Sequence, residues 1–243
     1  MTAVFDATVR DGVCRLARPA TRWLSTGHGG GACRADAVYN CTVPEGWDRT
    51  DLDAYVAERL AAAGFEADGP ALLTGVDQRH ARRARLGPVE AVATAGVSNP
   101  AALPVTVAPS ADRPTDDAPA TRTGDGHAGT VNVVVGTTRA LEPGALPNLL
   151  TVAAEAKAAT LLELVGVPGT TTDAVVAACD PDGDPARFSG SATAVGGAAR
   201  ACVRDAVAAS LAARYPDGVG VDDPESGVVT DERAAVSSLA PDH

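Results

Sequence analysis

The run GTVNVVV at residues 129–135 constrains the fold of this chain more than any other feature. Four valines in five positions, lying between a Gly- and Asp-rich stretch and the polar segment TTR, are typical of a short buried strand. Side chains alternate along a strand, so Thr130, Asn132 and Val134 are expected on one face and the other valines on the opposite face. Two polar side chains, Thr130 and Asn132, therefore share a face near the start of a buried strand.

A long Ala- and Leu-rich helix is predicted after this strand, over residues 144–165. At 100° per residue, the side chains within about 40° of Lys157 are Leu146, Leu150, Ala153, Leu161 and Leu164. Lys157 is the only lysine in the chain, and a buried ammonium is unfavourable unless it is paired. It either reaches out to solvent, meets a structural carboxylate, or supplies a compact ammonium for chemistry that arginine cannot perform. Glu155 lies about 160° round the helix, so we expect it to be solvated and not to pair with Lys157.

The other patterns predict interleaved strands and helices. We expect a β-hairpin over residues 3–18 that turns at Asp11-Gly12, strands at 37–43, 71–76, 89–97 and 172–178, and helices at 52–63 and 192–213. Thr50 and Asp53 form a variant capping box, and the basic segment 78–85 is expected to be a solvated connection. Strict βα alternation is missing, which argues against a Rossmann sheet. The prediction is an α+β fold, a layered sandwich of mixed or antiparallel β-sheet with packed helices.

These elements indicate one domain over residues 1–215. Residues 104–128 are rich in Pro, Asp, Thr and Gly, and are expected to be an acidic loop or linker within that domain. Residues 216–243 are expected to form a loosely ordered acidic tail.

Composition excludes some classes of function. The formal charge is −11 with no basic face, which argues against a nucleic-acid binder. The basic residues are arginine apart from Lys157, the acidic residues are spread along the chain, and aromatic residues make up only 3%. This pattern is typical of a protein from a high-salt cytosol, where screening within about 3 Å at molar salt weakens repulsion among the acidic residues. A GC-rich genome would also favour Arg and Ala.

The N-terminal sequence and the cysteines favour a cytoplasmic protein. MTAVFDATVRDGVC has no apolar signal core, and no apolar run approaches the length of a membrane span. The five cysteines contain no C-x-x-C pair, so we interpret them as small buried apolar residues in a reducing compartment. A homo-oligomer is compatible with the sequence.

Thr130 is the first candidate for chemistry. A threonine hydroxyl can attack an amide if a base removes its proton, and that base can be a deprotonated lysine or an α-amine freed by cleavage before the threonine. Asn132, on the same face, can donate a hydrogen bond to a developing oxyanion. The alternative is that Thr130 is an ordinary strand residue and Asn132 a turn cap.

Two glycine-rich segments are candidates for binding. GHGGGA at 27–32 allows a close approach of backbone to a ligand, but it lacks the lysine of a P-loop and the spacing of a dinucleotide motif. His28 in this loop is a metal ligand, a base or a loop residue without such a role. SGSATAVGGAA at 189–199 either offers backbone N–H groups at a helix N-terminus or allows close helix packing.

Taken in order, these segments resemble the adenosylcobinamide amidohydrolase family of corrinoid salvage. The matching pieces are WLSTGHGGGA with AVYNCTV, ATAGVSNPA, residues 129–163, and GTTTDAVVAA. A Ser-Gly-Ser segment before the last helix completes the set, and the resemblance runs from about residue 22 to 212. The chain departs from the family pattern in the long 104–128 region and in TTR at 137–139, where an acidic residue is usual.

The resemblance implies a reaction. Water would cleave the amide that joins 1-amino-2-propanol to a propionate side chain of the corrin ring, releasing adenosylcobyric acid. The substrate would bring the cobalt, so no protein-bound metal or other cofactor is implied. A fainter resemblance of residues 129–178 to ornithine acetyltransferases and related aminopeptidases implies a fold of the N-terminal-nucleophile type. It places Thr130 at the nucleophile and Thr172-Asp173 on a later strand.

The resulting hypothesis is a corrinoid amidohydrolase that binds neither nucleic acid nor membrane. Thr130 attacks the amide or positions water, Lys157 carries the proton, and Asn132 with backbone N–H groups near Gly129 or Gly75 holds the oxyanion. The predicted substrate-binding residues are His28, Gly29, Gly30, Gly31, Asn40, Asn99, Gly129, Thr172 and Asp173. The alternatives are an acyltransferase of the ornithine acetyltransferase type and a non-catalytic corrinoid carrier.

Overall fold

A computed structural model describes residues 3–44, 46–66, 69–105, 129–219 and 227–237. Most of the predicted linker 104–128 and parts of the predicted tail lie outside these residues. The elements, in chain order, are β1 (Asp6–Arg10), β2 (Val13–Ser25), β3 (Gly31–Thr42), α1 (Leu52–Ala62), β4 (Ala71–Thr74), the 3₁₀ turn η1 (Gln78–His80), β5 (Arg82–Leu86), β6 (Val89–Ala95), β7 (Ala101–Ala102), β8 (Val131–Thr137), β9 (Ala140–Leu141), α2 (Ala145–Val165), β10 (Ala174–Cys179), β11 (Pro185–Ala186), α3 (Ala194–Arg214) and β12 (Val228–Val229).

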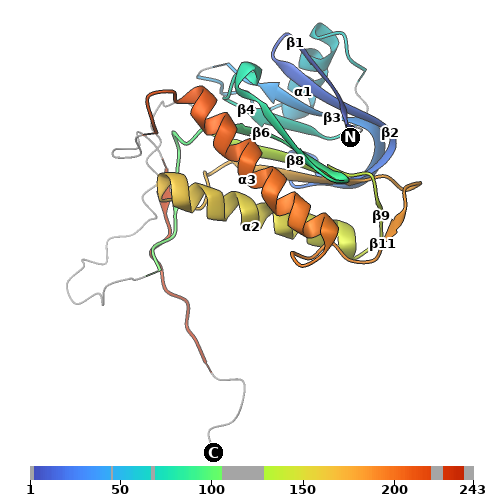
Figure 1. Ribbon diagram of the computed structural model, residues 1–243. Helices are drawn as coiled ribbons and strands as arrows, with labels where there is room; N and C mark the ends of the chain where they lie inside the picture. Colours follow the sequence, from blue (N-terminus) through green and yellow to red (C-terminus); the bar gives the residue numbers. More distant parts are fainter. Residues whose placement is uncertain (1–2, 45, 67–68, 106–128, 220–226, 238–243) are drawn as a thin grey trace, which may run out of the picture.

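Eight strands form one mixed sheet in the order β4-β3-β2-β10-β8-β6-β5, with β1 also paired to β2. β10 is parallel to β8 and β3 is parallel to β4, whereas the other neighbours in this sheet are antiparallel. The sheet curls over itself, so that β8 faces β3 and β4, which are not its neighbours in the strand order. Asn132 on β8 donates hydrogen bonds to Asn40 on β3 and to the carbonyl of Leu73 on β4. Figure 1 shows the resulting layers, with β1–β4 and α1 on the upper side of the central strands, α2 below these strands and α3 running obliquely across them. The predicted α+β layered fold with a mixed sheet is confirmed.

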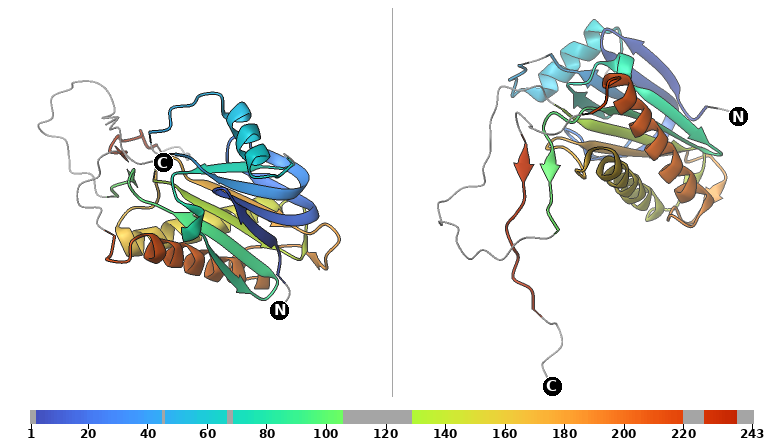
Figure 2. Two further views of the ribbon diagram at one scale, coloured as in Figure 1. Left: turned by 90° about the horizontal axis from the view of Figure 1, so that it is seen from above. Right: turned by 60° about the vertical axis from the view of Figure 1, so that its left-hand side comes forward.

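Alternation along the central strands supplies two cores. Val131, Val133 and Val135 pack with α2 and α3, whereas Val134 packs between the two halves of the curled sheet. Figure 2 shows α2 and α3 side by side on one face of the same strands in both views. The facing predicted for β8 is therefore confirmed, and Asn132 lies with Val134 on the side toward β3 and β4.

The predicted hairpin is confirmed: β1 and β2 pair around Asp11 and Gly12, whose φ angles of 45° and 74° suit a type I′ turn. The prediction for residues 78–85 was wrong in part, because only residues 78–81 form a connection. Residues 82–86 form β5, and the side chains of Arg83 and Arg85 pair with the fully buried carboxylate of Glu90 at 2.9 and 2.8 Å. The arginines suggested a solvated segment because their buried partner, Glu90, lies on the next strand and is not visible in the local sequence pattern.

The expectation for the cysteines is met by four of the five. Cys14, Cys41, Cys179 and Cys202 are buried, and Cys33 is exposed. Burial raises the pKa of the Cys14 thiol to about 11 and that of Cys41 to about 12, so neither is a ready nucleophile.

The first turn of α1 is capped by Asp51, not by the predicted Thr50–Asp53 box. The Asp51 carboxylate accepts a hydrogen bond from the backbone N–H of Ala54 at 3.2 Å. We expect Asp51→Ala to lower the free energy of unfolding by about 1 kcal/mol, the usual value for an N-cap. Thr50→Ala is the matched control and is expected to change it by less than about 0.5 kcal/mol. Urea unfolding at constant salt measures both, and equal losses would contradict the assignment.

Candidate active site

A cavity of about 320 Å³ opens between the two halves of the curled sheet. Its wall is formed by residues 26–28, 43, 47, 52, 72–75, 130 and 172–174. β3 and β4 end at this place, whereas β8 and β10 begin here. We call it the interlayer cavity. Its volume suits the side arm of a large ligand.

Thr130 lies in this wall, one residue before β8. Its side chain is buried, and its hydroxyl oxygen lies 2.8 Å from the hydroxyl oxygen of Thr172. Thr172 lines the same cavity and lies two residues before the start of β10. The parallel pairing of β8 and β10 brings the two hydroxyls together.

The structure leaves no room for a side chain at Gly129. A Cβ at this position would lie 2.3 Å from the backbone nitrogen of Ser98 and 2.8 Å from the side-chain oxygen of Asn99. The segment after β6 therefore packs directly against the residue that precedes Thr130, and the N–H of Gly96 donates to the Thr130 carbonyl at 3.1 Å. This packing fixes the backbone on which the hydroxyl stands.

Asp173 is the centre of a polar cluster beneath Thr130. It accepts hydrogen bonds from the N–H of Val131 at 2.8 Å, from the N–H of Thr170 at 3.0 Å and from the Thr170 hydroxyl. The ammonium of Lys157 donates to its second oxygen. Both carboxylate oxygens are thus engaged by donors from three different residues.

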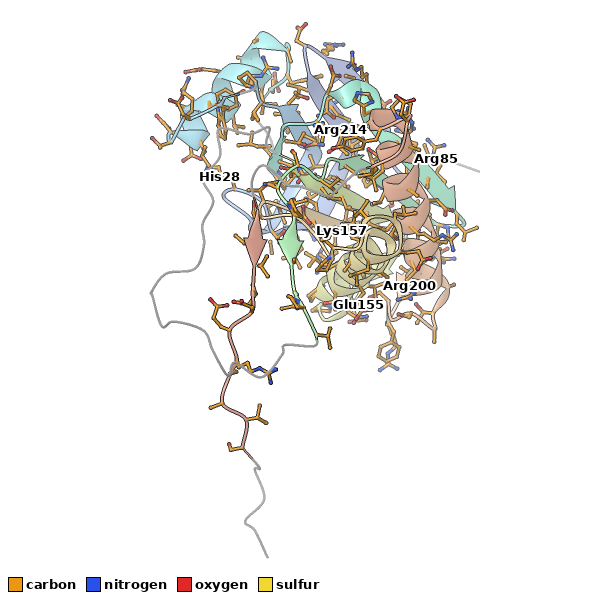
Figure 3. All side chains as sticks on the ribbon, turned by 90° about the vertical axis from the view of Figure 1, so that its left-hand side faces the viewer. His28, Arg85, Glu155, Lys157, Arg200 and Arg214 are labelled. Carbon is orange, nitrogen blue, oxygen red and sulfur yellow. The ribbon has the colours of Figure 1, made fainter. Side chains whose placement is uncertain are left out.

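Lys157 lies on the buried face of α2, as predicted, with 8% of its surface exposed. The buried face of α2 is rotated relative to the predicted one, because Leu164 is half exposed whereas Leu149 and Val152 are buried. Figure 3 shows Lys157 apart from Glu155, which is exposed and meets Arg200 at 3.7 Å. The wall of the interlayer cavity includes Asp173, and Lys157 reaches the site through that carboxylate. The predicted role of proton carrier therefore requires Asp173 as an intermediary.

Asn132 and Asn40 lie deeper than the sequence suggested. The two amide hydrogens of Asn132 bond to Asn40 and Leu73, and the amide of Asn40 bonds to the Thr94 hydroxyl at 2.9 Å. These contacts join the two halves of the sheet below the interlayer cavity. Asn132 thus has no amide hydrogen left for an oxyanion in this arrangement, and Asn40 is not placed to touch a ligand in the cavity. Asn99 bonds to the Thr171 hydroxyl at 2.6 Å, beside Gly129.

The glycine loop borders a second cavity, of about 350 Å³, lined by residues 25, 28–35, 53, 56 and 69–71. Gly29, Gly30 and Gly31 face only this second cavity, whereas His28 belongs to the walls of both. The His28 ring lies 2.8 Å from the carboxylate of Asp53 on α1. Figure 3 shows His28 at the side of the molecule where the loop meets the sheet.

Sequence reasoning missed several wall residues. Trp47 contributes its ring to the interlayer cavity and packs on Tyr55, with centroids 5.1 Å apart. One of only two tryptophans, placed in a polar loop, was the available signal. Gly75, which the sequence hypothesis did name, lines the cavity as well, and its backbone N–H has no hydrogen-bond partner among the described residues.

The Ser-Gly-Ser segment lies elsewhere. The Ser189 hydroxyl donates to the carbonyl of Ala145, the first residue of α2. Ala145 follows the C-terminal end of β8, whereas Thr130 precedes the N-terminal end of that strand. Thr193 caps α3, and a Cβ at Gly196 would lie 2.1 Å from the Gly190 carbonyl. Close packing therefore explains Gly196.

No group of three His, Cys, Asp or Glu side chains suited to a metal ion occurs within the part of the chain that the structure describes. In that same part, no helix is both long and apolar enough to cross a membrane.

Comparison with known proteins gives consistent results. Residues 2–218 match the family model described as adenosylcobinamide amidohydrolase. A curated adenosylcobinamide amidohydrolase of Halobacterium salinarum is 55% identical over 96% of this chain and 99% of its own length. A curated adenosylcobinamide amidohydrolase of Methanosarcina mazei is 27% identical over 71% of this chain and 81% of its own length. Among solved structures, a β-aminopeptidase of Burkholderia sp. is 18% identical, with a TM-score of 0.42, over 87% of this chain and 82% of that one.

Proposed function

The chain belongs to the adenosylcobinamide amidohydrolase family, and from this we propose that it hydrolyses the aminopropanol amide of adenosylcobinamide to adenosylcobyric acid, with Thr130 as the attacking group. The family and the 55% identical relative support the hydrolase reaction, and they do not favour an acyltransferase or a passive carrier. The observation that carries the assignment of the site is a buried hydroxyl, Thr130, in the wall of the interlayer cavity.

In this proposal the amide-bearing arm of the corrinoid enters the interlayer cavity, and the ring stays outside it, because a tetrapyrrole is too large for about 320 Å³. Attack by Thr130 gives an ester with the corrinoid acid, and water then releases the acid. The N–H of Gly75 stabilises the oxyanion, because it lines the cavity and makes no other hydrogen bond among the described residues. The cobalt belongs to the substrate.

The remaining polar groups position Thr130. Thr172 orients its hydroxyl across 2.8 Å, and Asp173 fixes the next residue by accepting from the N–H of Val131. Lys157 supplies the counter-charge to the Asp173 carboxylate in a nearly buried place. Asn132 and Asn40 hold the two halves of the sheet at the spacing that the cavity needs.

Incubating the purified protein with adenosylcobinamide tests the reaction. Adenosylcobyric acid and 1-amino-2-propanol are expected in equal amounts, measured by mass spectrometry. The assay belongs in molar KCl, because the net charge of −11 and the Halobacterium relative support a protein that works at high salt. A coloured stoichiometric complex without product would favour a carrier, and acetyl exchange from N-acetylornithine would favour an acyltransferase.

A further inference from the structure

Hydrolysis of an amide needs a proton on the departing nitrogen, and the wall of the interlayer cavity offers few groups that can deliver it. Among the described residues of that wall, the titratable side chains are His28 and Asp173. Asp173 is committed to Lys157, Thr170 and Val131 through both oxygens. His28 is the group left to exchange protons with a ligand.

The surroundings of His28 suit such exchange. One ring nitrogen lies 2.8 Å from the Asp53 carboxylate, and the side chain retains 35% exposure, so the other side of the ring can meet ligand and solvent. A carboxylate at one nitrogen fixes the orientation of the ring. The side chain of Asp53 is 92% exposed, so its contact with His28 is expected to make only a modest contribution to the orientation of the ring.

The neighbouring glycines hold the loop in one place. A Cβ at Gly27 would lie 2.5 Å from the side chain of Leu72, and one at Gly30 would lie 2.4 Å from the carbonyl of Ser25. The backbone on both sides of His28 therefore packs tightly against β2 and β4. A histidine in a glycine-rich segment is thus held at a fixed position on the cavity wall.

We propose that His28, oriented by Asp53, is the catalytic residue that carries the proton in the reaction, a role that rests on the proposed amidohydrolase function. Neutral His28 takes the proton of the Thr130 hydroxyl as the C–O bond to the amide carbon forms. It gives that proton to the nitrogen as the C–N bond breaks and the electron pair goes to the departing amine. In the second half, His28 takes a proton from water as the water oxygen bonds to the acyl carbon, and the Thr130 oxygen receives that proton as its C–O bond to the acyl carbon breaks.

The test compares His28→Gln, Asp53→Asn and the matched control His80→Gln, since His80 lies on η1 away from the cavity. With adenosylcobinamide, His28→Gln is expected to lower kcat by roughly 10²- to 10⁴-fold, with KM nearly unchanged. Asp53→Asn is expected to lower kcat by about tenfold. His80→Gln should match the unaltered protein. Circular dichroism and titration with the coloured corrinoid verify folding and binding.

A second substrate separates proton transfer from binding. The p-nitroanilide of adenosylcobyric acid has a leaving group that departs with little help from an acid. On it, His28→Gln is expected to lose less activity than on adenosylcobinamide, because this substrate still needs the base but no longer needs the acid. Added imidazole should restore part of the activity of His28→Gly on adenosylcobinamide. Equal losses on both substrates, or turnover of adenosylcobinamide by His28→Gln within threefold of the unaltered protein, would overturn the assignment. If the unaltered protein itself released no cobyric acid, the proposed function would fail first.

Discussion

Replacing Thr130 with alanine is expected to lower kcat for adenosylcobinamide by roughly 10³-fold or more, as with loss of other catalytic nucleophiles. The substitution removes one hydroxyl and one methyl group from the wall and leaves the other wall residues in place, so binding of the corrinoid arm in the proposed position should survive. Turnover is measured by release of aminopropanol, and binding is measured by the visible spectrum of the corrinoid.

Two further variants sharpen this experiment. Thr130→Ser keeps the hydroxyl and is expected to retain activity within about tenfold. Thr151→Ala is the matched control, because this exposed threonine on α2 bonds only to the Pro147 carbonyl of its own helix. Acid-quenched reactions should contain protein heavier by the mass of the corrinoid acyl group, with the ester on Thr130. Turnover by Thr130→Ala at the unaltered rate would remove the hydroxyl from the chemistry, and loss of turnover without any acyl adduct would leave Thr130 as the residue that positions water.

Lys157→Met is expected to lower the free energy of unfolding by about 3 kcal/mol. Methionine has a similar shape, but it leaves the Asp173 carboxylate, whose side chain is only 9% exposed, without its counter-charge. The effect lies at the lower end of the range for broken buried pairs, because Val131 and Thr170 still donate hydrogen bonds to Asp173. Urea unfolding at fixed KCl measures the difference.

The control and the double variant decide what the pair does. Arg200→Met breaks the exposed contact with Glu155 and should change stability by less than about 1 kcal/mol. Lys157→Met combined with Asp173→Asn removes both charges and should recover most of the lost stability. If activity stays low in this stable double variant, the ionised pair is needed to position Thr130. If activity returns with stability, the pair serves folding alone, and neither member carries a proton.

Local patterns predicted the elements of the fold, since they depend on spacings within a few residues. The alternation around Asn132, the Asp11-Gly12 turn and the buried placement of Lys157 are of this kind. β5 was missed because Arg83 and its partner Glu90 are joined by strand pairing, which leaves no local signal.

The candidate site was only partly accessible to the same reasoning. Thr130 could be selected because a hydroxyl at the start of a valine strand stands out, but its neighbour Thr172 is brought to it by the pairing of β8 with β10. The partner of Lys157 is 16 residues away on another element, and helical geometry alone could only exclude Glu155. The bonds from Asn132 to Asn40 and Leu73 depend on the curl of the sheet, which no short segment encodes.

The position of β10 between β2 and β8 has a consequence for how the protein acquires activity. A strand near the N-terminus waits for a partner about 150 residues later, and such distant pairing makes folding slow. During synthesis, the ribosome must release residue 179 before the central sheet can close. Thr172 and Asp173 arrive with β10, so a partly folded chain lacks part of the proposed site. The appearance of hydrolysis during refolding should therefore coincide with the final step of assembly.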